Sequence, residues 1–132
     1  MTKRAIVPAE LKASAEALKM TPAIVWGDFA FLTSVTGGDF DGQMPRDPER
    51  QFRNVFRKTE MVLREAGAAF ASVVEMTTYH VGLRDTFDLF DAIRTQYLAP
   101  PYPAWTAVEV AGLRREGAIV EMRVIAGLSG KS

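Results

Sequence analysis

The sequence contains no cysteine and a single histidine, His80. The absence of cysteine excludes disulfides, zinc–thiolate centres and a cysteine nucleophile. One histidine cannot form the histidine cluster that a transition-metal site usually requires. We therefore predict that the protein works without a metal ion or any other cofactor.

An excess of charge is also missing, because 16 lysine and arginine residues face 16 aspartate and glutamate residues. Nucleic-acid binding needs a basic excess, and no run of Lys or Arg is longer than two, so we expect no nucleic-acid partner. No apolar run approaches the ~18 residues of a membrane span, and the first residues reach charges and Pro8 too soon for a signal peptide. These absences predict a cytoplasmic protein with no membrane partner.

What the chain does contain is ordinary for a globular protein. Its 132 residues are 48% hydrophobic and 24% charged. This length suits one domain, so we assign residues 1–132 to a single unit. A net charge of zero leaves little repulsion between copies, which suits an oligomer.

Two period-two segments near the C-terminus, residues 104–110 and 118–126, indicate half-buried strands. The short polar segment 114–117 between them favours an antiparallel hairpin. Alternation predicts Trp105, Ala107 and Glu109 on one side of the first strand. It also predicts that Glu121 and Arg123 share one side of the second.

The remaining elements follow from similar patterns. Residues 3–7, 23–26, 29–35 and 73–81 are predicted strands, with Gly27-Asp28 as a hairpin turn. Asp47 and Pro48 open a helix that ends at Gly67, and Asp85 is the predicted cap of a second helix. Residues 9–20 are read as either a turn of helix or a surface loop.

The order of these elements predicts an α+β fold, in which both helices pack on one face of a mixed sheet. The other face would then carry Trp105, Ala107, Ile119 and Ile125 among polar groups. Such a face is too apolar to be simply solvated. We therefore expect it to be buried against identical subunits.

Two stretches of this chain form a pair of motifs: Pro-Ala-x-Thr-Ala-Val-Glu-Val-Ala-Gly-Leu from Pro103, and Val-Glu-Met-x-x-Ile-Ala from Val120. Together they resemble the C-terminal signature of the RidA/YjgF family, also called L-PSP. The resemblance covers residues 23–126. It implies a chorismate-mutase-like α+β fold and a homotrimer with a barrel-like centre. It also implies that small-molecule ligands bind in clefts between subunits, as in the reactive-imine deaminases of the family.

Glu121 matches the family glutamate that positions or activates the water attacking the imine carbon. The alternative is a strand glutamate paired with Arg123 or Arg53. Trp105 stands where the deaminating members carry an arginine that grips a substrate carboxylate, and an indole cannot replace that two-point contact. Trp105 either accepts a different ligand, fills the cleft, or packs a subunit interface.

Further ligand-binding positions come from the same resemblance. Arg123 is a candidate to supply the missing guanidinium, or else pairs with Glu121 or Glu109. Thr106 follows Trp105 in the signature. Ser34 and Val35 match the family Thr-Ser-Gly, with valine in place of glycine, and Met20 falls where the family has a substrate-contacting tyrosine.

Three functions remain open on this basis. The first is hydrolytic deamination of a small imine or enamine, with a substrate altered by Trp105. The second is a trimer that binds a small metabolite without turning it over. The third, ribonuclease activity or inhibition of translation, ranks last because the sequence offers neither a basic face nor an acid–base pair.

Overall fold

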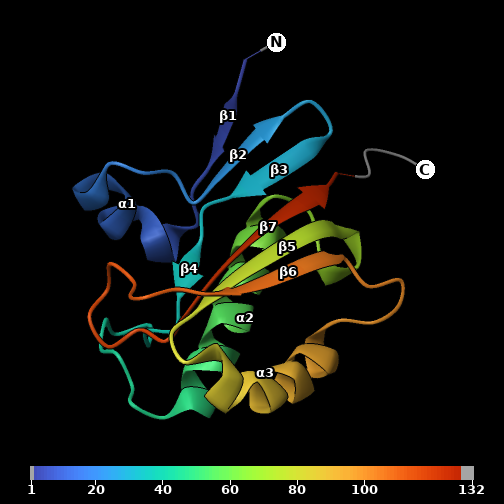
Figure 1. The fold of residues 1–132 in the computed structure, drawn as a ribbon. Coiled ribbons are helices and arrows are strands. Elements are labelled where there is room, and N and C mark those ends of the chain that lie inside the picture. Colours follow the sequence, from blue (N-terminus) through green and yellow to red (C-terminus); the bar gives the residue numbers. More distant parts are fainter. Residues whose placement is uncertain (1, 129–132) are drawn as a thin grey trace.

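The computed structural model describes residues 2–128, which form a mixed sheet of seven strands (Figure 1). The strand order is β1-β2-β3-β7-β5-β6, and β4 also pairs with β7. Among the strands of residues 2–128, only β5 and β6 run parallel. The strands are β1 (Arg4–Ile6), β2 (Ala23–Trp26), β3 (Phe29–Leu32), β4 (Val35–Thr36), β5 (Val73–His80), β6 (Ala104–Glu109) and β7 (Val120–Gly127). The predicted α+β class is confirmed.

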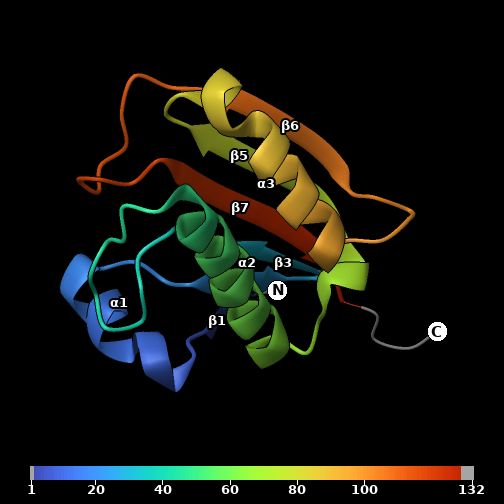
Figure 2. The ribbon, with the colours of Figure 1, turned by 90° about the horizontal axis from the view of Figure 1, so that it is seen from below.

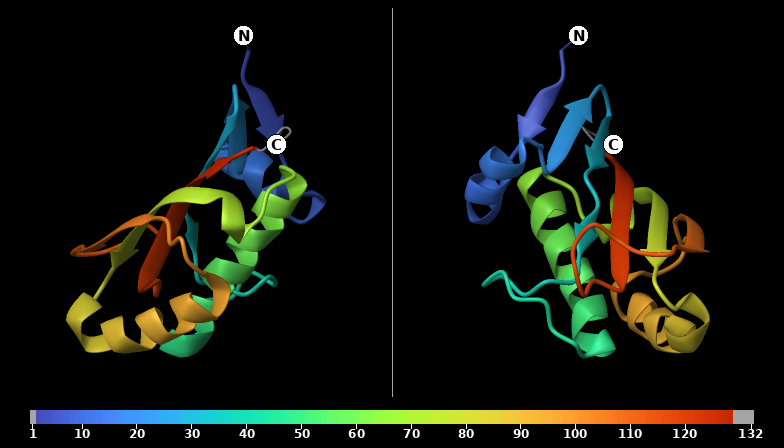
Figure 3. Two further views of the ribbon diagram at one scale, coloured as in Figure 1. Left: turned by 90° about the vertical axis from the view of Figure 1, so that its right-hand side faces the viewer. Right: turned by 60° about the vertical axis from the view of Figure 1, so that its left-hand side comes forward.

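Two long helices, α2 (Pro48–Glu65) and α3 (Leu83–Tyr97), cover one face of the sheet, as predicted (Figures 2 and 3). Residues 9–20, predicted as either a turn of helix or a surface loop, contain a 3₁₀ turn, η1 (Ala9–Leu11), and a short helix, α1 (Lys12–Leu18). A second 3₁₀ turn, η2 (Phe70–Ser72), leads into β5. None of the helices within residues 2–128 has the length and apolarity needed to cross a bilayer.

The start of α2 agrees with the predicted cap and first residue, whereas the start of α3 differs. Asp47 holds the N-cap position of α2, yet its side chain makes no capping hydrogen bond. Helix α3 begins at Leu83, so Asp85 lies in its first turn rather than at the cap. Gly82 adopts a positive φ of 72° at this N-cap, and the carboxylate of Glu109 accepts a hydrogen bond from the Leu83 N–H at 3.0 Å. A group from β6 therefore caps the helix, which local sequence could not reveal.

The predicted hairpin between the last two strands is wrong. Strand β5 lies between β6 and β7 and bonds to both, so residues 110–119 form a connection between strands that are not neighbours. Helix α3 carries the chain from β5 to the outer edge of the sheet, because a parallel pair needs such a crossover.

This topology also corrects the predicted face of Trp105. Trp105 and Ala107 stand opposite Met76 and Thr78 of β5, which are both buried. These side chains therefore lie on the helix-covered side, whereas Glu121 points to the open side. Ile119 also packs against the core rather than the open face.

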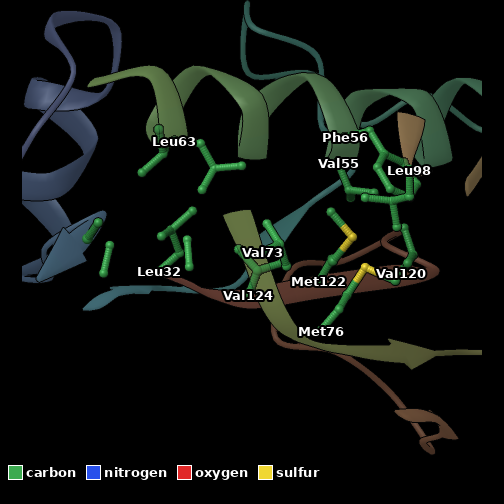
Figure 4. Close-up of a cluster of buried hydrophobic side chains, with 14 of the residues drawn as sticks. Leu32, Val55, Phe56, Leu63, Val73, Met76, Leu98, Val120, Met122 and Val124 are labelled. Atoms are coloured by element: carbon green, nitrogen blue, oxygen red, sulfur yellow. The ribbon is translucent and has the colours of Figure 1, made fainter. Parts of the chain in front are cut away.

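The core lies between the sheet and the two helices, as the side chains in Figure 4 show. Alternate residues of β7 are buried, including Val120, Met122 and Val124, as the period-two pattern predicts. They meet the apolar stripe of α2, which contributes Val55 and Phe56. Burial of this stripe against the sheet stabilises both elements.

The open face of the sheet carries a band of large apolar side chains. Trp26 is 49% exposed, Phe29 44% and Phe31 43%. Strand register places Ile24 beside Phe31, and Phe31 beside Ile125. The apolar character expected of this face is present, although the hairpin of β2 and β3 supplies most of it. We define these five residues as the open-face band.

His80 is fully buried on the core side of β5, where the rings of Phe52 and Phe90 meet it edge-on. Neither of its ring nitrogens has a hydrogen-bond partner within the described residues. Burial lowers the pKa of His80 from 6.5 to about 4, because a charged imidazole loses its hydration there. The folded protein therefore holds this ring neutral.

We expect folding stability to fall as the pH drops from 7 to 4, by up to about 3 kcal/mol from His80. The unfolded chain takes up a proton near pH 6.5, and the folded chain does so only near pH 4. Urea unfolding of wild type and His80→Leu at fixed protein concentration checks this. The sequence has one histidine, so the difference between the two profiles reports that ring. Parallel profiles between pH 7 and 5 contradict the prediction.

Candidate active-site pocket

A pocket of about 410 Å³ opens beside β4, between α1, α2 and the start of β7. The predicted residues Met20, Ser34, Val35 and Glu121 all line it. Apolar walls come from Leu11, Ala15, Leu18 and Val62. The pocket thus combines an apolar lining with a few polar groups, as small-molecule sites usually do.

Glu121 is held at the pocket by the short strand β4. Val35 and Thr36 pair with Met122 and Glu121, which brings β4 alongside β7. The Ser34 hydroxyl donates a hydrogen bond to Oε2 of Glu121. This bond leaves carboxylate lone pairs to accept a proton from water, because a carboxylate offers about four acceptor sites.

The alternative ion pairs of Glu121 do not form. Arg53 binds Glu49 at 2.9 Å and donates to Gln96. Arg123 is exposed, and no carboxylate of residues 2–128 lies within 4.0 Å of its guanidinium. The expected pairs with Glu121 and Glu109 are therefore absent from this part of the chain.

Three predicted positions lie away from this pocket. Thr106 of β6 and Arg123 of β7 are the two register partners of Thr77, which lies between them on β5. Both are exposed on the open face. Trp105 lies on the other face of the sheet. One chain therefore cannot present Trp105 and Glu121 to the same small ligand.

Trp105 packs against α3 in its own subunit. Its Nε1–H donates to Oγ1 of Thr78 at 2.9 Å, and its ring lies parallel to Phe87 with centroids 5.8 Å apart. The Arg94 guanidinium lies over the indole, 4.3 Å from the ring centroid. Asp91 holds Arg94 through two hydrogen bonds of 2.9 and 2.7 Å. Arg94 of the same chain thus already covers an aromatic face of Trp105, where one of the three alternatives placed a ligand.

Sequence reasoning missed the basic residues of the pocket, Lys58, Arg114 and Arg115. Lys58 lies three residues after Val55 and four before Val62, on the edge of the apolar stripe of α2. A lysine at that spacing was a usable signal. The two arginines were read as turn residues of a hairpin that does not exist.

Two buried amides of α2 hold the loops around the pocket. Gln51 donates to the carbonyls of Pro45 and Gly117 at 2.8 and 2.9 Å, and accepts from the Ile119 N–H at 2.9 Å. Asn54 donates to the Gly37 carbonyl and to Asp39 at 2.9 and 2.8 Å. These bonds fix both the loop after β4 and the loop before β7.

A more open hollow of about 740 Å³ lies near the start of α2. Its main charged groups already pair with one another: Arg50 with Asp39, and Arg53 with Glu49. None of the predicted site residues lines it. Within residues 2–128, no three acidic or histidine side chains are grouped to hold a metal ion.

A comparison with known families matches residues 11–128 to the family described as Endoribonuclease L-PSP. The chain belongs to the RidA/YjgF (L-PSP) family. RutC family protein YjgH of Escherichia coli (strain K12) is 32% identical over 109 residues, which cover 82% of each chain. The resemblance seen in the sequence is therefore confirmed.

Solved structures of the RidA/YjgF family agree with this assignment. A structure of protein YJGH matches with a TM-score of 0.88 at 29% identity, covering 97% of this chain and 98% of that one. RidA from the Antarctic bacterium Psychrobacter sp. PAMC 21119 matches with a TM-score of 0.77 at 25% identity, covering 82% and 87%. The sheet and helices described above are thus those of the RidA/YjgF fold.

Proposed function

We propose that this RidA/YjgF protein hydrolyses a small imine or enamine, with Glu121 orienting and deprotonating the attacking water. The observation that carries the proposal is the Glu121 carboxylate, fixed by Ser34 at an apolar-walled pocket. A positioned carboxylate contributes general-base catalysis when water lies within hydrogen-bond reach. Attack of that water on the C=N carbon, with the proton taken by Glu121 returned to the nitrogen, is followed by loss of ammonia and gives the carbonyl product. An enamine reacts in the same way after it tautomerises to the imine.

We further propose that the working form is a homotrimer with ligand clefts between subunits. The open-face band supports burial against other copies, because exposed aromatic side chains at this density mark an interaction surface.

The second candidate is a trimer that binds a metabolite without turnover. It is favoured by position 105, where an uncharged ring packed on α3 replaces the family's carboxylate anchor. Ribonuclease activity, which the family description names, ranks below both. The one histidine is fully buried, and the net charge is zero.

The deciding experiment generates imines in solution and follows their conversion to carbonyl compounds. The panel pairs imines that carry a carboxylate with neutral ones of similar size. We expect wild type to accelerate hydrolysis of at least one imine over buffer. Saturable binding of the carbonyl products without acceleration of any imine would instead establish the binding protein.

A further inference from the structure

The pocket beside Glu121 holds more positive than negative charge. Lys58 reaches it from α2, and Arg114 and Arg115 reach it from the loop before β7. No carboxylate of residues 2–128 lies within 4.0 Å of any of these three side chains. Glu121 is the one acidic residue among those that line the pocket within the same residues. The pocket is thus suited to a ligand with a negative charge.

Lys58 and Arg115 are half-buried, whereas Arg114 is exposed. Burial lowers the pKa of the Lys58 ammonium, and the positive charge of Arg115 lowers it further. Asp39 opposes this effect from a distance. The Nζ of Lys58 donates one hydrogen bond, to the Thr36 carbonyl oxygen at 3.1 Å. An ammonium has three N–H donors. Donors therefore remain for a bound group.

Gly38 keeps open the space next to both cations. A Cβ at this position would lie 3.4 Å from Nη1 of Arg115 and 3.5 Å from Nζ of Lys58. The two nitrogens are thus no further apart than the sum of those distances. Asn54 fixes the flanking residues Gly37 and Asp39, so the gap is preformed. A preformed pair of donors binds an anion with little ordering cost.

We infer that Lys58 and Arg115, supported by Arg114, form an anion subsite of this pocket, and that the imine accepted there carries a carboxylate. This inference deepens the proposed function and rests on it. The carboxylate anchor then comes from the same subunit as Glu121. Position 105 then no longer needs the arginine of the family, because Lys58 and Arg115 supply the positive charge.

Binding of unreactive probes tests the subsite without catalysis. We expect wild type to bind pyruvate at least about tenfold more tightly than methyl pyruvate, which has the same carbonyl but no charge. Lys58→Met should lower pyruvate affinity by at least about tenfold and leave the ester unchanged. Gly38→Asp, which places a carboxylate between the two cations, should have the same effect. Titrations followed by NMR or calorimetry measure both ligands.

Arg64→Gln is the matched control, because Arg64 is an exposed cation on the same helix that does not line the pocket. Circular dichroism checks that each variant is folded. Equal affinity of wild type for pyruvate and its ester overturns the inference, as does failure to bind pyruvate. So does unchanged pyruvate affinity in both folded variants.

The two proposals fail in different ways. Charge-dependent pyruvate binding with no imine hydrolysis keeps the subsite and removes the enzyme. Hydrolysis of neutral imines that Lys58→Met leaves unaltered keeps the enzyme and removes the subsite. Both hold if Lys58→Met raises KM for carboxylate-bearing imines alone.

Discussion

Glu121→Gln is expected to reduce imine hydrolysis by about 10²–10⁴-fold, which corresponds to ~3–5 kcal/mol of lost transition-state stabilisation. The amide keeps the size of the side chain, and its oxygen still accepts the hydrogen bond from Ser34. It cannot take a proton from water. The loss should therefore appear in kcat, with KM nearly unchanged, and steady-state rates on the most reactive imine measure it.

The matched control for this variant is Glu60→Gln. Glu60 is an exposed carboxylate on α2, between pocket residues Lys58 and Val62, and does not line the pocket itself. Glu60→Gln should hydrolyse imines at the same rate as wild type. If Glu121→Gln hydrolyses imines at the wild-type rate, Glu121 is not the base, and the proposed mechanism is rejected.

Phe31→Asp is expected to dissociate the trimer and to reduce hydrolysis with it. Phe31 lies near the middle of the open-face band, with Ile24 and Ile125 as register neighbours. An unpaired carboxylate buried in an interface costs several kcal/mol per subunit, ~3–5 by analogy with broken buried ion pairs. That cost raises the dissociation constant by at least about 10³-fold. Sedimentation at micromolar concentration should find trimer for wild type and monomer for the variant.

Phe40→Asp is the control for the same chemical change. Phe40 is 57% exposed in the loop after β4, away from the open-face band. It should leave the assembly intact. A wild type that sediments as a monomer would falsify the trimer and the inter-subunit cleft together. A trimeric Phe31→Asp would move the interface off the open face.

The two Discussion variants also separate chemistry from assembly. Glu121→Gln should remain trimeric with strongly reduced hydrolysis, whereas Phe31→Asp should be monomeric with its pocket residues unchanged. Pyruvate binding that persists in the monomer would place the anion subsite within one chain. This agrees with Lys58, Arg115 and Glu121 all lining one pocket of a single subunit.

The sequence by itself determined most of the segments that become helices and strands, and which residues of each strand share a face. Local periodicity carries this information, because alternate side chains of a strand such as β7 point to opposite faces of the sheet. The family signature around Glu121 also located the candidate base of the proposed site and its hydrogen-bond partner Ser34. Both line the pocket in the structure.

The neighbours of each strand were decided by tertiary structure. Strand β5 comes from a distant part of the chain and lies between β6 and β7. Its register with β6 places Trp105 on the helix-covered face of the sheet. No local pattern encodes this, because both arrangements bury an alternating strand equally well. Lys58 and Arg115 lie far apart in sequence, and only the folded loops bring both beside Gly38. A subsite built from such distant side chains exists only once the sheet order is fixed.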